Sequence, residues 1–111
     1  MPRKRSRQRK QPPLRGTRKT GIVLMQHAIT RARERYDKRL TLSDIANMND
    51  RIQRGQGTFI ERQSTTRTVW ALVYQGTWYA AVYNKQLGSI ATFLARWKLD
   101  QWEEWGFLKR E

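Results

Sequence analysis

The sequence predicts a single α+β domain with two N-terminal helices, a four-stranded antiparallel meander and a C-terminal helix. Its 111 residues are enough for one domain with one core and too few for two. Apolar residues recur every three or four positions in the first half of the chain, which is typical of helices. After Gly57 the period changes to two, which is typical of strands, and glycine-containing turns separate the strand-like segments.

The first 20 residues are predicted to form a flexible basic arm ahead of a folded domain of residues 21–111. Residues 1–19 contain nine basic residues, three prolines and no acidic residue. Leu14 is nearly the only apolar residue before position 21. Such a segment buries too little apolar surface to offset the conformational entropy that it would lose on ordering.

Two helices are predicted between residues 21 and 55. The first spans about residues 21–36, and the second begins after Thr41, an N-cap residue with Asp44 at the third helical position, where a carboxylate is favoured. Gly55 and Gly57 end the second helix. The apolar stripe of the first helix consists of Ile22, Met25, Ile29, Ala32 and Tyr36, and that of the second of Leu42, Ile45, Met48 and Ile52.

The second half of the chain is predicted to form the meander and the last helix. Short turns, among them Gln75-Gly76, join the strands as hairpins. Apolar residues on both faces of the middle strands indicate that helices cover at least one face of the sheet. The expected strands are residues 58–62, 68–74, 78–83 and 89–94, and the expected helix is residues 95–105, ended by Gly106.

The charge of the chain favours a polyanionic partner. The sequence has 23 Lys and Arg residues against nine Asp and Glu residues, a formal net charge of +14. Nucleic acid is the first expectation and an anionic membrane surface a weaker one. No apolar run is long enough to cross a membrane and no secretory signal is recognisable, so we expect no membrane partner. A cytoplasmic location is expected.

Several kinds of chemistry are excluded or disfavoured by the residues present. The chain has no cysteine, which excludes disulfides, cysteine-ligated zinc and a thiol nucleophile. It shows no Walker phosphate loop, dinucleotide fingerprint, HExxH motif or EF-hand pattern. With one histidine and scattered carboxylates, we expect no metal ion and no other cofactor.

Basic residues along the chain are candidates for nucleic-acid contacts. Those of the arm suit a clamp that does not depend on sequence, because each phosphate contact releases counterions; a solubilising or targeting tail is the alternative. Arg35 and the cations on either side of the polar loop 63–66 are further candidates. The nucleic-acid-binding set is Arg3, Lys4, Arg5, Arg7, Arg9, Lys10, Arg35, Arg62 and Arg67.

The first helix carries the candidate reactive residues. His27 and Arg31 are four residues apart and therefore share a face, and Arg35 lies one further turn along. An ordinary surface histidine on a solvated, arginine-rich helix is the alternative interpretation. These polar positions, with the segments that follow, resemble those of the small nucleases and toxins grouped with barnase, EndoU, the tRNase colicins and RelE. The matching segments lie within residues 24–94 and are HAITRAR, DIANMNDRIQRGQG, TVWALVYQGTWYAAVY and SIATFL.

The resemblance implies metal-independent cleavage of RNA by its own 2′-hydroxyl group. It suggests a toxin or a phage host-takeover factor, which would act in the cytoplasm of the host cell if the protein is phage-borne. His27 would be the general acid or base, Arg31 and Arg33 would hold the phosphate, and Thr92 would orient it. The chain has no second histidine, so Tyr83, Glu61, Arg67 or a lysine would have to supply a second group. The alternative is a non-catalytic protein on the same fold that binds RNA, DNA, a ribosome or tRNA, or inhibits a host protein.

The aromatic residues also permit two interpretations. Trp78 and Tyr79 are candidates for a base-stacking platform, while Trp70, Trp97 and Phe93 are expected in the core. On the C-terminal helix, Trp102 and Trp105 are candidates for contact with a protein partner.

Overall fold

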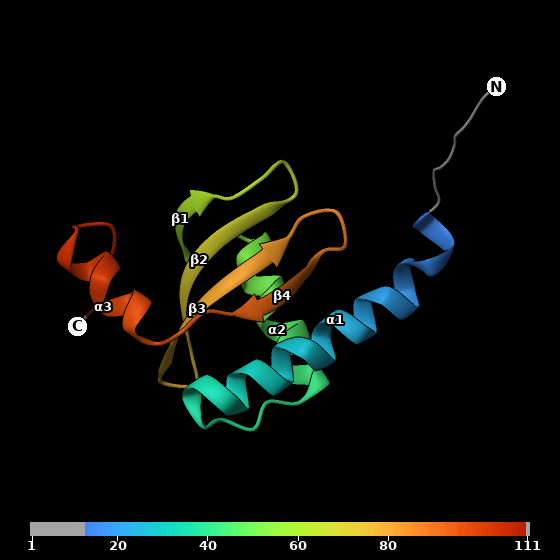
Figure 1. Cartoon of the computed structure of the whole chain (residues 1–111), viewed down its shortest axis with the longest axis horizontal. Coiled ribbons are helices and arrows are strands. Elements are labelled where there is room, and N and C mark those ends of the chain that lie inside the picture. Colours follow the sequence, from blue (N-terminus) through green and yellow to red (C-terminus); the bar gives the residue numbers. More distant parts are fainter. Residues whose placement is uncertain (1–12, 111) are drawn as a thin grey trace.

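A computed structural model describes the backbone of residues 13–110 and the side chains of residues 21–110. Three helices and a four-stranded sheet follow one another in the predicted order, which confirms the α+β class (Figure 1). The elements are α1 (Pro13–Tyr36), α2 (Leu42–Gln53), β1 (Thr58–Arg62), β2 (Arg67–Tyr74), β3 (Thr77–Asn84), β4 (Ser89–Phe93) and α3 (Trp97–Glu104).

The sheet is the predicted antiparallel meander, with the strand order β1-β2-β3-β4. Gln75 and Gly76 form the tight turn between β2 and β3, with φ values of 50° and 79°. Two successive residues with positive φ fit the right-handed twist of the hairpin that they connect. Leu72 of β2 consequently pairs with Tyr79 of β3. In the next hairpin, Tyr83 of β3 pairs with Ile90 of β4.

Helix α1 begins at Pro13, eight residues earlier than the sequence analysis predicted. The predicted boundary between arm and domain, after residue 20, therefore falls within a helix. A proline at the first helical turn suits a helix start, and extending a helix that is already formed costs far less than nucleating one. In Figure 1 the N-terminal turns of α1 project beyond the sheet.

Helix α2 begins with the predicted cap. The backbone N–H of Asp44 donates to Oγ1 of Thr41 at 3.1 Å, and the backbone N–H of Thr41 donates to Oδ2 of Asp44 at 2.9 Å. The hydroxyl of Tyr74 also donates to Oδ1 of Asp44 at 2.7 Å, which ties the cap to β2. The Thr41 backbone donor, followed by the Tyr74 hydroxyl, lowers the pKa of Asp44 below its ordinary value of 3.8.

Replacing Asp44 by asparagine is expected to lower the free energy of unfolding by about 1 kcal/mol at pH 7. Because the pKa is lower in the folded state, the ionised carboxylate stabilises the fold above about pH 4. This contribution is lost as the pH falls through the folded-state pKa, so the difference between wild type and variant should shrink below pH 4. Urea unfolding at pH 7 and at acidic pH measures both effects.

Asp50→Asn is the matched control on the same helix. It removes only the exposed ion pair with Arg54, in which the closest atoms are 3.1 Å apart. Exposed pairs of this kind contribute about 0–1 kcal/mol. An equal loss of stability in both variants, or a loss in Asp44→Asn that is the same at every pH, would contradict the assignment.

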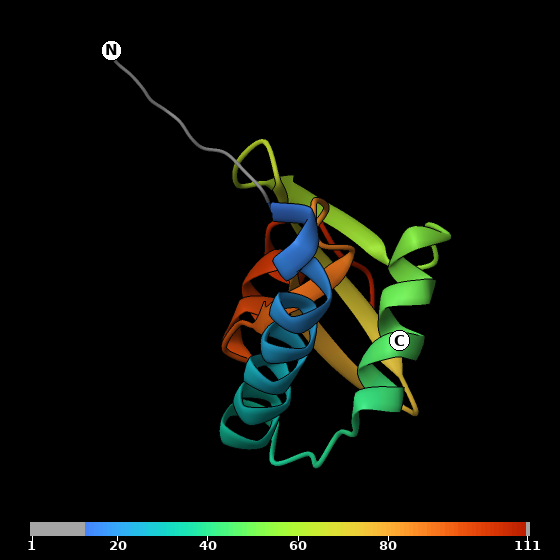
Figure 2. The same ribbon diagram turned by 90° about the vertical axis from the view of Figure 1, so that its right-hand side faces the viewer.

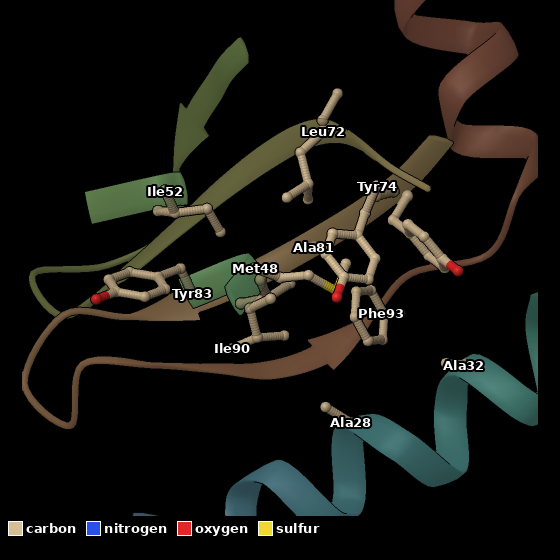
Figure 3. Packing of buried hydrophobic residues seen from close by; sticks show 14 of the residues in the cluster. Ala28, Ala32, Met48, Ile52, Leu72, Tyr74, Ala81, Tyr83, Ile90 and Phe93 are labelled. Carbon is tan, nitrogen blue, oxygen red and sulfur yellow. The ribbon is translucent and has the colours of Figure 1, made fainter. Parts of the chain in front are cut away.

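One face of the sheet is covered by α1 and α2. Figure 3 shows Ala28 and Ala32 of α1 directed toward the sheet near Phe93, with Met48 and Ile52 of α2 above the same face. An aromatic cluster of Tyr36, Tyr79 and Phe93 joins α1 to β3 and β4, with ring centroids 4.9, 5.2 and 6.1 Å apart. The small alanine side chains let α1 approach the sheet closely, and the aromatic rings fill the remaining space between α1 and the sheet.

The opposite face of the sheet is covered by α3 and the residues after it. Because side chains alternate along a strand, the residues between those of the first face point to the other side. Helix α3 packs against β3, and Figure 2 shows the strands lying between α2 and α3. The buried residues of this second layer are Val69, Ala71, Ala80 and Val82 from the sheet, and Leu99, Trp102 and Leu108 from the C-terminal segment.

Helices in the part of the chain that the structure describes are too short or too polar to cross a membrane.

Candidate nucleic-acid interface

One side of α1 carries His27, Arg31 and Arg35 on three successive turns. Each four-residue step rotates a side chain by about 40° around the helix axis, so the row winds gradually toward the sheet. His27 and Arg31 are exposed. Arg35 donates from Nη1 to the carbonyl oxygen of Phe93 at 2.8 Å, so the row ends on β4.

The contact between Arg35 and Phe93 covers the free edge of β4. The next residue of the chain, Leu94, donates its N–H to Ala80 of β3 at 2.7 Å. Because backbone groups alternate in direction along an antiparallel strand, the Phe93 carbonyl points away from β3, to the side that has no strand partner. Arg35 therefore occupies an edge position that would otherwise need water or another chain.

Tyr36 fixes the end of α1 at the same place. Its hydroxyl donates to the carbonyl oxygen of Leu94 at 2.7 Å and accepts from the N–H of Ala80 at 3.0 Å. Burial raises the pKa of Tyr36, while the hydrogen bond from Ala80 and the positive charges of Arg96 and Arg35 act in the opposite direction. Both guanidinium groups thus lie close enough to influence this hydroxyl.

Arg31 and Arg33 do not share a side of α1. Arg31 forms an exposed ion pair with Glu34, with 2.6 Å between Nη1 and Oε1. Arg33 is also exposed, but two helical positions rotate it by about 200°, which places it roughly 160° from Arg31. The structure therefore does not place the two guanidinium groups around one phosphate.

Thr92 is half-buried on β4 and faces away from the layer that contains α1. It pairs with Val82, whereas the next residue, Phe93, contacts Tyr36 of α1. Neighbouring strand residues point to opposite faces, so Thr92 lies on the α3 side of the sheet. Among residues 21–110, no hydrogen bond or ion pair connects His27, Arg31 and Thr92, so the expected convergence is not seen.

The candidate second groups lie elsewhere in the fold. Tyr83 is buried, and its hydroxyl accepts from Nε2 of Gln53 at 2.8 Å. Glu61, Arg62 and Arg67 are exposed on β1 and β2, at the opposite edge of the sheet from β4. Arg62 and Arg67 consequently lie apart from the cations of α1, which packs against β4. The six cations predicted to bind from the arm (Arg3, Lys4, Arg5, Arg7, Arg9 and Lys10) lie outside the described residues.

Several aromatic residues lie in places other than those expected. Tyr79 is 2% exposed and Trp102 is 5% exposed, so neither is available as a stacking platform or docking residue. Trp97, expected in the core, is 56% exposed. The expectation of a buried Phe93 is confirmed, and Trp105 is 58% exposed. These errors share a cause, because composition does not fix which face of a strand or helix meets the core.

A pocket of about 520 Å³ lies where α1 ends, and the sequence analysis did not predict it. Its lining includes Tyr36 and Lys38 at the end of α1, Trp78 near the start of β3, and Arg96 and Leu99 around the start of α3. These three segments are far apart in the sequence and meet only through the sheet and the packing of α3. No local motif could therefore have revealed the pocket.

No group of three or more His, Cys, Asp or Glu side chains that could hold a metal ion occurs in the described part of the chain. Comparison with protein-family models, with curated proteins and with solved structures gave no match. The resemblance to the small nucleases and toxins therefore stays a prediction.

Proposed function

We propose that the protein binds RNA through a cationic surface formed by its N-terminal basic segment and α1. One observation carries the proposal: His27, Arg31 and Arg33 are exposed on a helix that runs unbroken from Pro13 into the core. Nine of the 23 basic residues lie at positions 1–19, so this helix leads directly from the most basic segment to the folded domain.

The local charge balance of α1 supports phosphate binding. No acidic residue occurs in its first turn, and Arg33 and Arg35 lie in its last turn. Glu34 pairs with Arg31, but an exposed ion pair is weak enough to exchange for a phosphate. RNA is favoured over DNA because the resemblance is to proteins that cleave RNA.

Replacing both Arg31 and Arg33 by glutamine is expected to weaken binding to a short single-stranded RNA by roughly 3- to 30-fold at low salt. Two phosphate contacts would be lost, so the negative slope of log affinity against log salt should become shallower by about 1.4. Fluorescence anisotropy over a series of salt concentrations measures both quantities. Arg54→Gln, which removes the partner of Asp50 on α2, is the matched control. Wild-type binding by the double variant, or an equal loss in the control, would contradict the proposal.

Metal-independent RNA cleavage is the second candidate function. It is favoured by one observation, the exposed imidazole of His27 with an arginine one turn away on the same side of α1. Imidazole can accept or donate a proton near neutral pH, and a guanidinium can stabilise the developing charge on phosphorus.

If His27 is the general acid or base, the wild-type protein should cleave RNA in the presence of EDTA and leave 2′,3′-cyclic phosphate ends. His27→Ala should then cleave at least about 100-fold more slowly, while binding RNA with nearly unchanged affinity. Gel analysis of end-labelled RNA at several pH values between 5 and 8 measures the rates. Absence of cleavage by the wild-type protein at every pH would leave RNA binding without catalysis.

A further inference from the structure

The pocket at the end of α1 is built from three separated segments. Lys38 follows α1. Trp78 is the second residue of β3, just after the Gln75-Gly76 turn. Arg96 directly precedes α3, which contains Leu99. Its volume of about 520 Å³ lies within the usual range for small-molecule sites. Tyr36, the last residue of α1, also lines the pocket, which therefore lies beside the C-terminal end of this helix.

The wall of the pocket offers an aromatic surface. Trp78 is half-buried and lies on the sheet face that α3 covers, because it pairs with Val73 and alternates with buried Tyr79. Leu99 of α3, which is 3% exposed, lines the same pocket. An indole ring beside an aliphatic side chain forms a wall on which a flat heterocycle can stack.

The charged groups around this wall divide into free and occupied ones. Arg110 is held by Asp100 and Glu103, with atoms 2.5 and 3.0 Å apart. Lys38 and Arg96 form no ion pair within residues 21–110, so both cations can meet an anion. The carboxylate of Asp37, which forms no ion pair within residues 21–110, also lines the pocket and can accept hydrogen bonds from amino or imino groups.

An aromatic wall, two cations without an ion pair in residues 21–110 and a carboxylate acceptor together match a nucleotide. The base would stack on Trp78, its N–H groups would face Asp37, and its phosphate would face Lys38 and Arg96. We infer that this pocket takes one unstacked base of a single-stranded RNA bound along α1. The inference rests on the proposed RNA-binding function, and it adds a preference for single strands over duplexes, whose bases remain stacked and paired.

The variant that tests the inference is Trp78→Leu, which removes the aromatic ring and keeps an apolar side chain. Base stacking on an aromatic residue contributes about 1–3 kcal/mol, so single-stranded RNA should bind roughly 5- to 150-fold more weakly. A blunt duplex of the same sequence should bind with unchanged affinity. Trp105→Leu, at a residue 58% exposed on the far end of α3, is the matched control and should change neither affinity.

A second variant tests the same pocket at an exposed residue, in case Trp78→Leu disturbs the fold. Arg96→Gln changes only an exposed cation of the pocket and should weaken single-stranded RNA binding by about 3- to 10-fold, with the duplex again unaffected. A probe RNA containing 2-aminopurine gives an independent signal. The wild-type protein should quench its fluorescence, and Trp78→Leu should not.

The outcomes separate the inference from the proposed function. If the wild-type protein binds neither RNA, both fail. If it binds RNA but both pocket variants retain wild-type affinity, or lose affinity equally for single strand and duplex, the pocket is not a base site and the proposed function stands. Displacement of the RNA by adenosine monophosphate as readily as by unlabelled RNA would assign the pocket to a free nucleotide and overturn the inference.

Discussion

Phe93→Ala is expected to lower the free energy of unfolding by about 3–5 kcal/mol, the usual cost of truncating a buried phenylalanine. Phe93 is 0% exposed and packs against both Tyr36 and Tyr79. Its loss would leave a cavity between α1 and the sheet at the place where the helix is attached. Because small domains are stable by only about 5–15 kcal/mol, the variant should be close to unfolding at 37 °C.

Equilibrium urea unfolding followed by tryptophan fluorescence measures this change. Phe59→Ala is the matched control. Phe59 is 52% exposed on the edge strand β1, and among residues 21–110 its ring contacts one other aromatic ring, that of Trp70, with 5.4 Å between the centroids. It should cost less than about 1 kcal/mol. A similar cost in both variants would mean that the cluster of Tyr36, Tyr79 and Phe93 does not hold α1 on the sheet.

Deletion of residues 1–12 is expected to have the largest effect on RNA binding. The segment carries six cations. If all six contact phosphates of a single strand, the negative slope of log affinity against log salt should become shallower by about 4 when they are removed. The affinity itself should fall by roughly 10²- to 10⁴-fold near 0.1 M salt. The buried hydrophobic cluster begins at Ala28, so the unfolding midpoint should not change.

Anisotropy measured against salt concentration distinguishes charge from length. A second variant that keeps all 12 residues but replaces the six cations by glutamine should behave like the deletion. If the glutamine variant binds like the wild type, the segment contributes through something other than its charge. If the deletion retains the full salt slope, the phosphate contacts lie on the folded domain instead.

The order of the elements was predictable because each boundary has a local cause. Thr41 and Asp44 cap α2 through contacts within four residues, and Gln75-Gly76 supports the positive φ values that a tight hairpin needs. Local signals of this kind can be recognised without knowledge of the tertiary structure. The start of α1 was not predicted, because the residues before position 21 offer little apolar surface to be buried. The helix nevertheless continues back to Pro13, since no local signal ends it sooner.

Placement of individual side chains was less predictable. Tyr79 and Trp78 are neighbours of similar chemistry, yet one is in the core and the other lines a pocket, because the register of β2 and β3 assigns them to opposite faces. On α3, Trp102 is buried and Trp97 is exposed, since the rotation of the helix is set by its contact with β3.

In the candidate site, too, the placement of individual side chains was less predictable than the elements that carry them. The spacing of His27, Arg31 and Arg35 correctly placed them along one side of a helix. It could not show that Arg35 is bound to the Phe93 carbonyl or that Arg31 pairs with Glu34. The expected convergence with Thr92 depended on the face of β4 that Thr92 occupies, which only the sheet register determines.

The packing of α1 along β4 has a consequence for the order of folding. The two ends of the bond between Arg35 and Phe93 are 58 residues apart, whereas each hairpin of the meander closes within a few residues. Closing a long loop costs more entropy than closing a short one, so we expect the β2–β3 hairpin to form early and α1 to dock late. During synthesis, which begins at the N-terminus, α1 emerges well before β4. Helix α1 therefore spends the whole of translation without the strand against which it packs, close to the RNA of the ribosome that makes it.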